Sequence, residues 1–259
     1  MKRTRMIVVG LAAAASLVAG AAWAQFPFKG YLGEAVVDTA LAVPPSPQPG
    51  SPQAEADRAI FRSTRALEGT PRWALAIADA DEKKSLHAMR CALGVEIVNP
   101  MEAPKLARLL LKVAPDLNNA VNKPKALYSR KRPYLVDEGN ICIARDPKLD
   151  ASFDYPSGHA SWAWAMGLIL AELAPDRAPQ ILQRARVFGE SRVVCGVHNA
   201  SSVAAARDNG ASVIAALHGL PEFRADMEAA RVELAGLRAK ARPIEGCEAE
   251  AALLSVPAW

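Results

Sequence analysis

Residues 155–173, YPSGHASWAWAMGLILAEL, decide how the rest of this chain is interpreted. From Ala160 to Leu173 the stretch is apolar on almost every side of a helical wheel, which is typical of a helix buried in a core. The tetrapeptide PSGH at 156–159 precedes it and contains the residue types that turn a loop into a helix. The sequence therefore predicts that His159 lies at the start of a core helix.

The start of such a helix is a natural site for an anion. Its first N–H groups lack helical partners and it carries the positive end of the helix dipole, and both favour a bound phosphate. Gly158 lets the backbone come close to that anion, and Ser157 adds a hydroxyl group. Taken alone, the same tetrapeptide also fits a tight turn followed by an N-cap. The residues that accompany it elsewhere in the chain decide between the two.

The first 24 residues predict a secretory signal peptide. Three basic residues among positions 2–5 precede an apolar run over 6–21, and AWA at 22–24 supplies a small-x-small cleavage site. The alternative is an N-terminal membrane anchor, but glycine and serine residues interrupt the run. We therefore expect cleavage after Ala24 and a periplasmic protein.

Removal of this segment leaves 235 residues, enough for one well-cored domain. The segment holds three of the 31 basic residues and none of the 27 acidic ones, so the mature chain has a net charge of +1. A nearly neutral chain gives no support for binding nucleic acid. No later stretch has 18 uninterrupted apolar residues, so we expect no stable membrane span.

Cysteine is used sparingly and in an even number. An even number in an exported chain predicts two disulfides, and the sequence leaves all three pairings open. There is no C-x-x-C motif and no Cys/His cluster with zinc spacing, so we expect no metal and no other cofactor. The four positions are Cys91, Cys142, Cys195 and Cys247.

The remaining patterns are helical, and strand signals are nearly absent. Residues 25–54 form a proline-rich N-terminal arm, since PPSPQPGSP at 44–52 excludes regular structure. Residues 55–259 are expected to form a single compact all-α domain. Besides the core helix, helices are predicted over residues 55–67, 71–80, 83–93, 103–113, 117–131, 176–194, 198–217 and 221–241.

Two segments of this domain carry further expectations. Pro124 should break or restart the helix over 117–131, because proline removes a helical hydrogen bond. Residues 134–154 should form a long loop, and loops of that length are usually functional.

Cations and histidines gather in three short segments. One has Lys125 and, seven residues on, Arg132; another is PSGH at 156–159; the last has Arg192 and, six residues later, His198. Each segment also has a plain structural explanation, given above for PSGH. Lys125 and Arg132 could belong to a solvated basic helix end. Arg192 could be a cation at a helix C-terminus, and His198 a helix-start histidine or a core histidine with its hydrogen bonds satisfied.

In this order and spacing, K-x6-RP, PSGH and SR-x5-H resemble the three signature motifs of the vanadate haloperoxidase-like, type 2 phosphatidic acid phosphatase superfamily. The likeness is closest to its exported class A bacterial non-specific acid phosphatases. It extends to TPRWALA at 70–76, to SRVVCGVH at 191–198 and to the signal peptide, and so covers most of the mature chain. The resemblance implies the all-α fold of acid phosphatases and vanadium-dependent haloperoxidases.

The resemblance also implies a reaction, the hydrolysis of phosphomonoesters through a phosphohistidine intermediate. His198 would take the phosphoryl group, and His159 would protonate the leaving group. No metal or other cofactor is required, and the expected partner is a small-molecule phosphomonoester. The oligomeric state stays open, a homo-oligomer included. The phosphoryl oxygens would be held by Lys125, Arg132, Ser157, Gly158 and Arg192.

One position departs from the family pattern. The third motif normally ends in an aspartate four residues after the nucleophilic histidine, and here that position is Ser202. A serine can orient the imidazole of His198 but offers it no negative charge. We therefore expect a slowed phosphatase, which Ser202→Asp should accelerate.

A binding protein, a haloperoxidase and an integral lipid phosphatase are the alternatives to this function. The main alternative is a catalytically weakened phosphate-ligand binding protein of the same fold, for which Ser202 is the motive. Haloperoxidase chemistry is set aside because the motifs lie in an acid-phosphatase-like context. An integral lipid phosphatase is disfavoured because the sequence lacks membrane spans.

The proposed site suggests one of the three disulfide pairings. Cys142 lies in the loop before residue 156 and Cys195 just before His198, so a bridge between them would tie two sides of the site together. Cys91 would then pair with Cys247.

Overall fold

The computed structural model describes residues 29–33, 35 and 37–259, so the predicted signal peptide lies outside the described residues. Within them no strand occurs, and the all-α prediction is confirmed. The α-helices are α1 (Pro52–Thr64), α2 (Pro71–Ala78), α3 (Ser85–Ala88), α4 (Arg90–Leu93), α5 (Pro104–Tyr128), α6 (Pro147–Ala151), α7 (Gly158–Leu173), α8 (Ala178–Val194), α9 (Ala200–His218), α10 (Pro221–Arg238) and α11 (Cys247–Leu254). Short 3₁₀ helices are η1 (Thr39–Leu41), η2 (Arg65–Leu67), η3 (Glu82–Lys84), η4 (Pro100–Glu102), η5 (Pro133–Leu135) and η6 (Pro175–Arg177).

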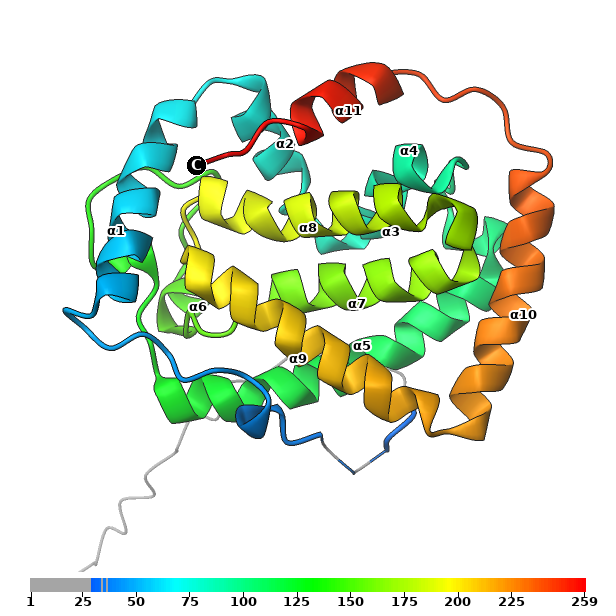
Figure 1. The fold of residues 1–259 in the computed structure, drawn as a ribbon, viewed down its shortest axis with the longest axis horizontal. Coiled ribbons are helices and arrows are strands. Elements are labelled where there is room, and N and C mark those ends of the chain that lie inside the picture. Colours follow the sequence, from blue (N-terminus) through cyan, green and yellow to red (C-terminus); the bar gives the residue numbers. More distant parts are fainter. Residues whose placement is uncertain (1–28, 34, 36) are drawn as a thin grey trace, which may run out of the picture.

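The predicted core helix is α7, and it lies at the centre of the bundle (Figure 1). It packs against α8, α9, α5 and α10. Met166, Ile169 and Leu170 are fully buried on it. At Gly167 an added Cβ would stand 2.4 Å from the Cβ of Ala185, so glycine is what allows α8 to approach so closely. The apolar sequence of α7 is thus explained by neighbours on nearly every side.

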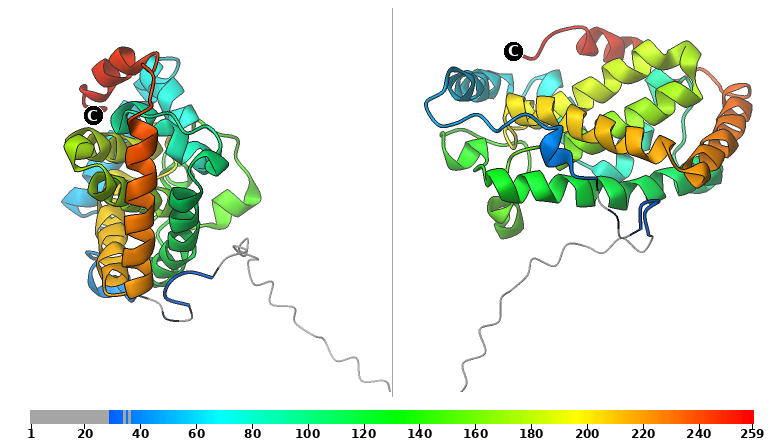
Figure 2. Two further views of the ribbon diagram at one scale, coloured as in Figure 1. Left: turned by 90° about the vertical axis from the view of Figure 1, so that its right-hand side faces the viewer. Right: turned by 60° about the horizontal axis from the view of Figure 1, so that its bottom comes forward.

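Four helix ends meet at one end of the bundle. There α5 and α8 end while α7 and α9 begin, with α6 and α1 beside them (Figure 1). Helix α10 runs across the opposite end, where the left view of Figure 2 shows it in front. None of the described helices combines the length and hydrophobicity needed to span a bilayer.

Helix α5 corrects the prediction of separate helices over residues 103–113 and 117–131, the second of them broken or restarted at Pro124. It runs unbroken from Pro104 to Tyr128. Pro124 has no N–H to give to the carbonyl of Ala120, but the buried hydroxyl of Thr39 donates to that carbonyl over 2.8 Å. The donor comes from the proline-rich arm, so only the folded chain can supply the bond that proline removes.

Three other segments are organised differently from the predictions. Helix α1 begins at Pro52, inside the predicted arm, because the side chain of Ser51 caps it. Residues 83–93 form three short pieces, and Arg184 donates to the carbonyl of Ala88 where a continuous helix would have used its own N–H. The predicted loop over 134–154 contains η5 and α6.

Both proposed disulfides are present. Cys142 pairs with Cys195, and Cys91 pairs with Cys247. The second bridge holds α11, a helix that the sequence patterns did not predict, against the rest of the domain. The first is reinforced by a backbone hydrogen bond of 2.9 Å from Cys142 to the carbonyl of Cys195.

Candidate active site

His198 lies in the turn between α8 and α9. The chain reverses there because the carbonyl of Arg192 accepts hydrogen bonds from the backbone N–H groups of Val197 (3.1 Å) and His198 (3.3 Å). Gly196 adopts a φ of +81°, and a Cβ on it would lie 2.5 Å from Nη1 of Arg65. Only glycine meets both conditions, so this turn holds the histidine in place.

The neighbours of His198 fix its tautomer. Nδ1 lies 2.8 Å from the carbonyl oxygen of Asp154 and 2.9 Å from its Oδ1, and Nδ1 therefore carries the proton. Nε2 lies 3.0 Å from Nη1 of Arg132, a group that can only donate. Nε2 is thus the unprotonated nitrogen, as a nucleophilic imidazole requires, and in the structure its lone pair accepts from Arg132.

Asp154 supplies the carboxylate that Ser202 was predicted to leave missing. The side chain of Asp154 is fully buried. It accepts hydrogen bonds from the backbone N–H of Asn199 (3.1 Å), from the side-chain amide of Asn199 (2.8 Å) and from the hydroxyl of Ser202 (2.5 Å). The prediction that His198 lacks an orienting carboxylate is therefore wrong. Asp154 was missed because it precedes His198 by 44 residues, whereas the family pattern directs attention to the helix after the histidine. Its only sequence signal was a carboxylate just before Tyr155.

Burial and the nearby cations keep the imidazole ring of His198 neutral. Burial lowers the pKa of His198 well below its usual value, and the cations of Arg132 and Lys125 lower it further, while Asp154 opposes them. Burial alone would raise the pKa of Asp154, but its contacts with His198 and the charge of Arg130 hold that pKa below its usual value. The pair is therefore a neutral imidazole donating to a carboxylate.

Lys125 lies near the end of α5, and Arg132 lies in the segment that follows it. Arg132 donates from Nε to the carbonyl of Ser152 (3.0 Å) and from Nη2 to its hydroxyl (2.7 Å), so its guanidinium is held rigidly beside the imidazole. Lys125 donates from Nζ to the carbonyl of Phe153. Burial, together with the nearby charge of Arg132, lowers the pKa of Lys125 to about 7.

Arg192 is a buried cation at the end of α8. Only 6% of the residue is exposed, and its Nε and Nη1 find no acceptor among the described residues. Burial lowers its pKa to about 10, so it stays charged at physiological pH. Leaving buried charged donors unpaired is costly, and an anionic ligand would satisfy them.

The start of α7 supplies the neutral donors. Ser157 is its N-cap, with a hydroxyl that accepts from the N–H of Ala160 (3.3 Å) and a backbone N–H that donates to the carbonyl of Ser202 (3.1 Å). A Cβ on Gly158 would meet only Val121, at 3.8 Å. Packing within the protein therefore does not require glycine there, whereas the close approach of a ligand would.

His159 is held from three directions. Its Nε2 lies 2.7 Å from the carbonyl of Asp79, its Nδ1 lies 2.7 Å from Oε1 of Glu82, and its ring stacks on Phe188. A carbonyl only accepts, so Nε2 carries a proton and Nδ1 is the nitrogen that shares a second proton with Glu82. Burial, with the charge of Arg192, lowers the pKa of His159, and Glu82 opposes that shift.

The structure gathers all seven predicted site residues where the four helix ends meet. Contacts join the separate motifs: Arg132 touches His198, and the carbonyl of Ser202 accepts from Ser157. Within the described part of the chain, no three His, Cys, Asp or Glu side chains are grouped so that they could hold a metal ion.

Comparisons with known proteins agree with this geometry. Residues 108–225 match the model of the PAP2 superfamily. An acid phosphatase of Zymomonas mobilis is 42% identical over 79% of this chain and 78% of its own length. The chain belongs to the PAP2 superfamily. Within it the protein is an enzyme of the acid phosphatase class.

Further relatives carry similar names. A non-specific acid phosphatase of Providencia stuartii is 34% identical over 78% of this chain and 83% of its own length. One of Salmonella typhimurium is 31% identical over 78% and 82%. A solved transmembrane PAP2 type phosphatidylglycerolphosphate phosphatase of Bacillus subtilis aligns with 65% of this chain and 86% of its own, at 18% identity and a TM-score of 0.46. That likeness is too weak to add to the assignment.

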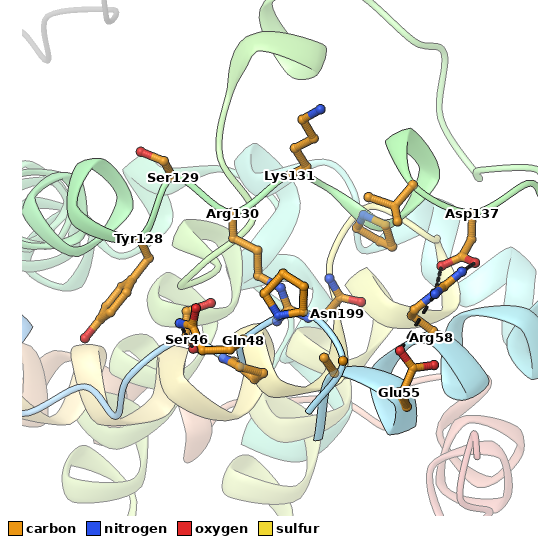
Figure 3. Close-up of a pocket in the computed structure, with 16 residues that line it drawn as sticks. Ser46, Gln48, Glu55, Arg58, Tyr128, Ser129, Arg130, Lys131, Asp137 and Asn199 are labelled. Atoms are coloured by element: carbon orange, nitrogen blue, oxygen red, sulfur yellow. Dashed lines mark hydrogen bonds and ion pairs between the residues drawn. The ribbon is translucent and has the colours of Figure 1, made fainter. Parts of the chain in front are cut away.

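A separate cavity of about 380 Å³ borders Asn199 and the proline-rich arm (Figure 3). Its two arginines are already paired with carboxylates. Arg58 lies 2.8 Å from Asp137, and Arg130 lies 2.8 Å from Asp57. Because both guanidinium groups are paired with carboxylates, they would attract an anion less strongly than Arg192 does in the PAP2 site.

Proposed function

We propose that the chain is a periplasmic acid phosphatase that hydrolyses small phosphomonoesters through a phosphohistidine on His198. One observation carries the proposal: Nε2 of His198, left unprotonated because Asp154 faces Nδ1, lies 3.0 Å from the buried guanidinium of Arg132, at the end of the bundle that also holds the buried cations Lys125 and Arg192. The predicted signal peptide and the two disulfides support export to an oxidising compartment.

Binding of the phosphoryl group is the first step. Lys125, Arg132 and Arg192 supply positive charge around its oxygens, and the start of α7 adds backbone N–H donors at Gly158. Phosphoryl transfer depends mostly on positioning and on neutralising charge, which a rigid cationic cradle provides.

Transfer to the enzyme is the second step. Nε2 of His198 gives up its hydrogen bond with Arg132 and attacks phosphorus, a P–N bond forms, and the P–O bond to the leaving group breaks. The developing positive charge on the imidazole is stabilised by Asp154 at Nδ1. His159 gives its Nδ1 proton to the leaving oxygen, so that an alcohol departs. Glu82 must release Nδ1 when that oxygen arrives.

Hydrolysis of the phosphohistidine is the third step. His159, now lacking that proton, takes one from water, and the oxygen of the water attacks phosphorus. The P–N bond breaks, its electron pair returns to Nε2, and inorganic phosphate leaves. His198 is then the same neutral tautomer with which the cycle began.

The electrostatics favour acid pH. The lowered pKa of His198 keeps the nucleophile unprotonated in mildly acid solution, where most histidines would be charged. Lys125, with a pKa of about 7, is a cation there. Both conditions are met on the acid side of neutrality.

The test is phosphate release from p-nitrophenyl phosphate at acid pH, with and without vanadate, and with His198→Ala as the blank. We expect turnover that vanadate inhibits, and a labelled enzyme that loses phosphate in acid but keeps it in base, as phosphohistidine does. Tight phosphate binding without turnover would instead support the binding-protein alternative. That alternative has lost its motive, because Asp154 provides the carboxylate that Ser202 does not.

A further inference from the structure

A groove of about 480 Å³ runs from His159 along one face of α5. Its floor is formed by residues of α5 at helical spacing, its sides by the segment from η3 to α3 and by the first turns of α7. Apolar side chains line most of it: Leu86, Leu110, Leu111, Leu117, Val121 and Trp162.

The groove begins where the proposed acid acts. Gly158 and His159 line its inner end, and Val121 lies beside Gly158. By contrast, Lys125, Arg132, Arg192 and His198 are not among the residues that line it. An ester whose phosphorus faces the nucleophile must direct its leaving oxygen to His159. Its organic part therefore enters this groove.

Five of the residues that line the groove have polar side chains, namely Glu82, Lys83, Ser85, Asn118 and His159. The hydroxyl of Ser85 accepts from Nε1 of Trp162 over 3.0 Å, which also fixes the indole ring, and Glu82 is paired with His159. A sugar or another hydroxylated leaving group would lay most of its hydroxyls against the apolar side chains that form the greater part of the lining, where hydrogen-bond partners are few.

We propose that the groove binds the aliphatic leaving group of the substrate, so that the preferred substrates are single-chain alkyl phosphate monoesters free in solution. From Leu110 to Val121 the floor spans eleven helical steps, or about 16 Å at the helical rise. That length accommodates an extended alkyl chain of several carbons. The inference rests on the proposed function, because it takes His159 as the acid.

The experiment compares ethyl, butyl, hexyl and octyl phosphate, with glycerol phosphate as a polar substrate of similar size to butyl phosphate. Each methylene that enters the groove should lower KM by about two- to fourfold, with kcat little changed, because the contact is equal in the ground and transition states. The Ki values of the matching alkylphosphonates should fall in parallel, which tests binding without turnover.

Two matched variants locate the effect. Leu111→Gln alters an exposed leucine of α5 in the groove (43% exposed), and Leu127→Gln alters one on the same helix outside it (63% exposed). We expect Leu111→Gln to raise KM for octyl phosphate at least threefold while leaving ethyl phosphate unaffected, and Leu127→Gln to change neither.

Two failures are distinguishable. Ethyl phosphate turnover with KM and Ki values independent of chain length would overturn the groove assignment and leave the phosphatase proposal standing. No turnover of any phosphomonoester, in folded protein, would overturn the proposed function and this inference with it.

Discussion

The hydroxyl of Ser202 donates to Oδ2 of Asp154 over 2.5 Å, while Oδ1 of the same carboxylate faces Nδ1 of His198 at 2.9 Å. The position that carries an aspartate in the family pattern therefore carries the serine that holds an aspartate from another segment. In this chain the carboxylate beside the imidazole therefore comes from the segment before α7 instead of from α9. His198 thus keeps a negatively charged partner at Nδ1 although position 202 is a serine.

Asp154→Asn should lower kcat steeply. The amide keeps the size of the side chain but removes the negative charge that stabilises the phosphorylated imidazole, and it can present a donor to Nδ1 and favour the wrong tautomer. By analogy with the serine-protease triad we expect a loss of about 10²- to 10⁴-fold. The measurement is kcat for p-nitrophenyl phosphate, with vanadate binding as the check that the cradle is intact. A variant that binds vanadate normally and retains full kcat would remove Asp154 from the mechanism.

Ser202→Asp should lower activity, the opposite of what the motif alone predicts. It would place two carboxylates within hydrogen-bonding distance in a buried site, and one of them would have to take up a proton or move away. We expect a lower melting temperature and a loss of about tenfold or more in kcat.

The double variant Asp154→Ser/Ser202→Asp should recover what either single change loses. It restores one carboxylate and one hydroxyl beside His198, with the carboxylate at the position where the family pattern has an aspartate. We expect kcat about tenfold or more above that of Asp154→Ser alone. If the double variant folds but is no more active than Asp154→Ser, position 202 cannot deliver a carboxylate to Nδ1 and the exchange is not functional.

Glu82→Gln should move the alkaline limb of kcat/KM to lower pH. The hydrogen bond and negative charge of Glu82 raise the pKa of His159, so their removal lowers it and the acid loses its proton earlier as pH rises. At mildly acid pH we expect a loss of roughly two- to tenfold, shrinking as pH falls. Lys84→Gln, two residues on in the same exposed turn and outside the groove, is the control. An unchanged limb in Glu82→Gln would mean that another group sets the proton affinity of the acid.

The sequence predicted what is local. The apolar run of α7, the PSGH turn and the cation and histidine motifs each depend on neighbours along the chain, and the structure shows all of them together. What escaped prediction depends on partners far away in sequence. Pro124 stays within a helix because the hydroxyl of Thr39 donates a hydrogen bond to the carbonyl of Ala120. The carboxylate beside His198 comes from a segment that no helical spacing connects to the histidine.

Anion binding should weaken as pH rises through the pKa of Lys125. Burial and the charge of Arg132 lower that pKa to about 7, so the lysine is cationic below this pH and increasingly neutral above it. Sulfate is the suitable probe, because its own charge does not change over this range, whereas that of phosphate does. Its dissociation constant, measured by calorimetry, should rise as pH passes through the transition, by at most about tenfold for each pH unit, and level off where the other cations alone hold the anion. Lys125→Arg keeps the charge at all these pH values and should flatten the curve, while Lys131→Arg, at a nearby exposed position, should not. A sulfate affinity that does not change through this pH range in the wild type would exclude Lys125 as a titrating member of the cradle.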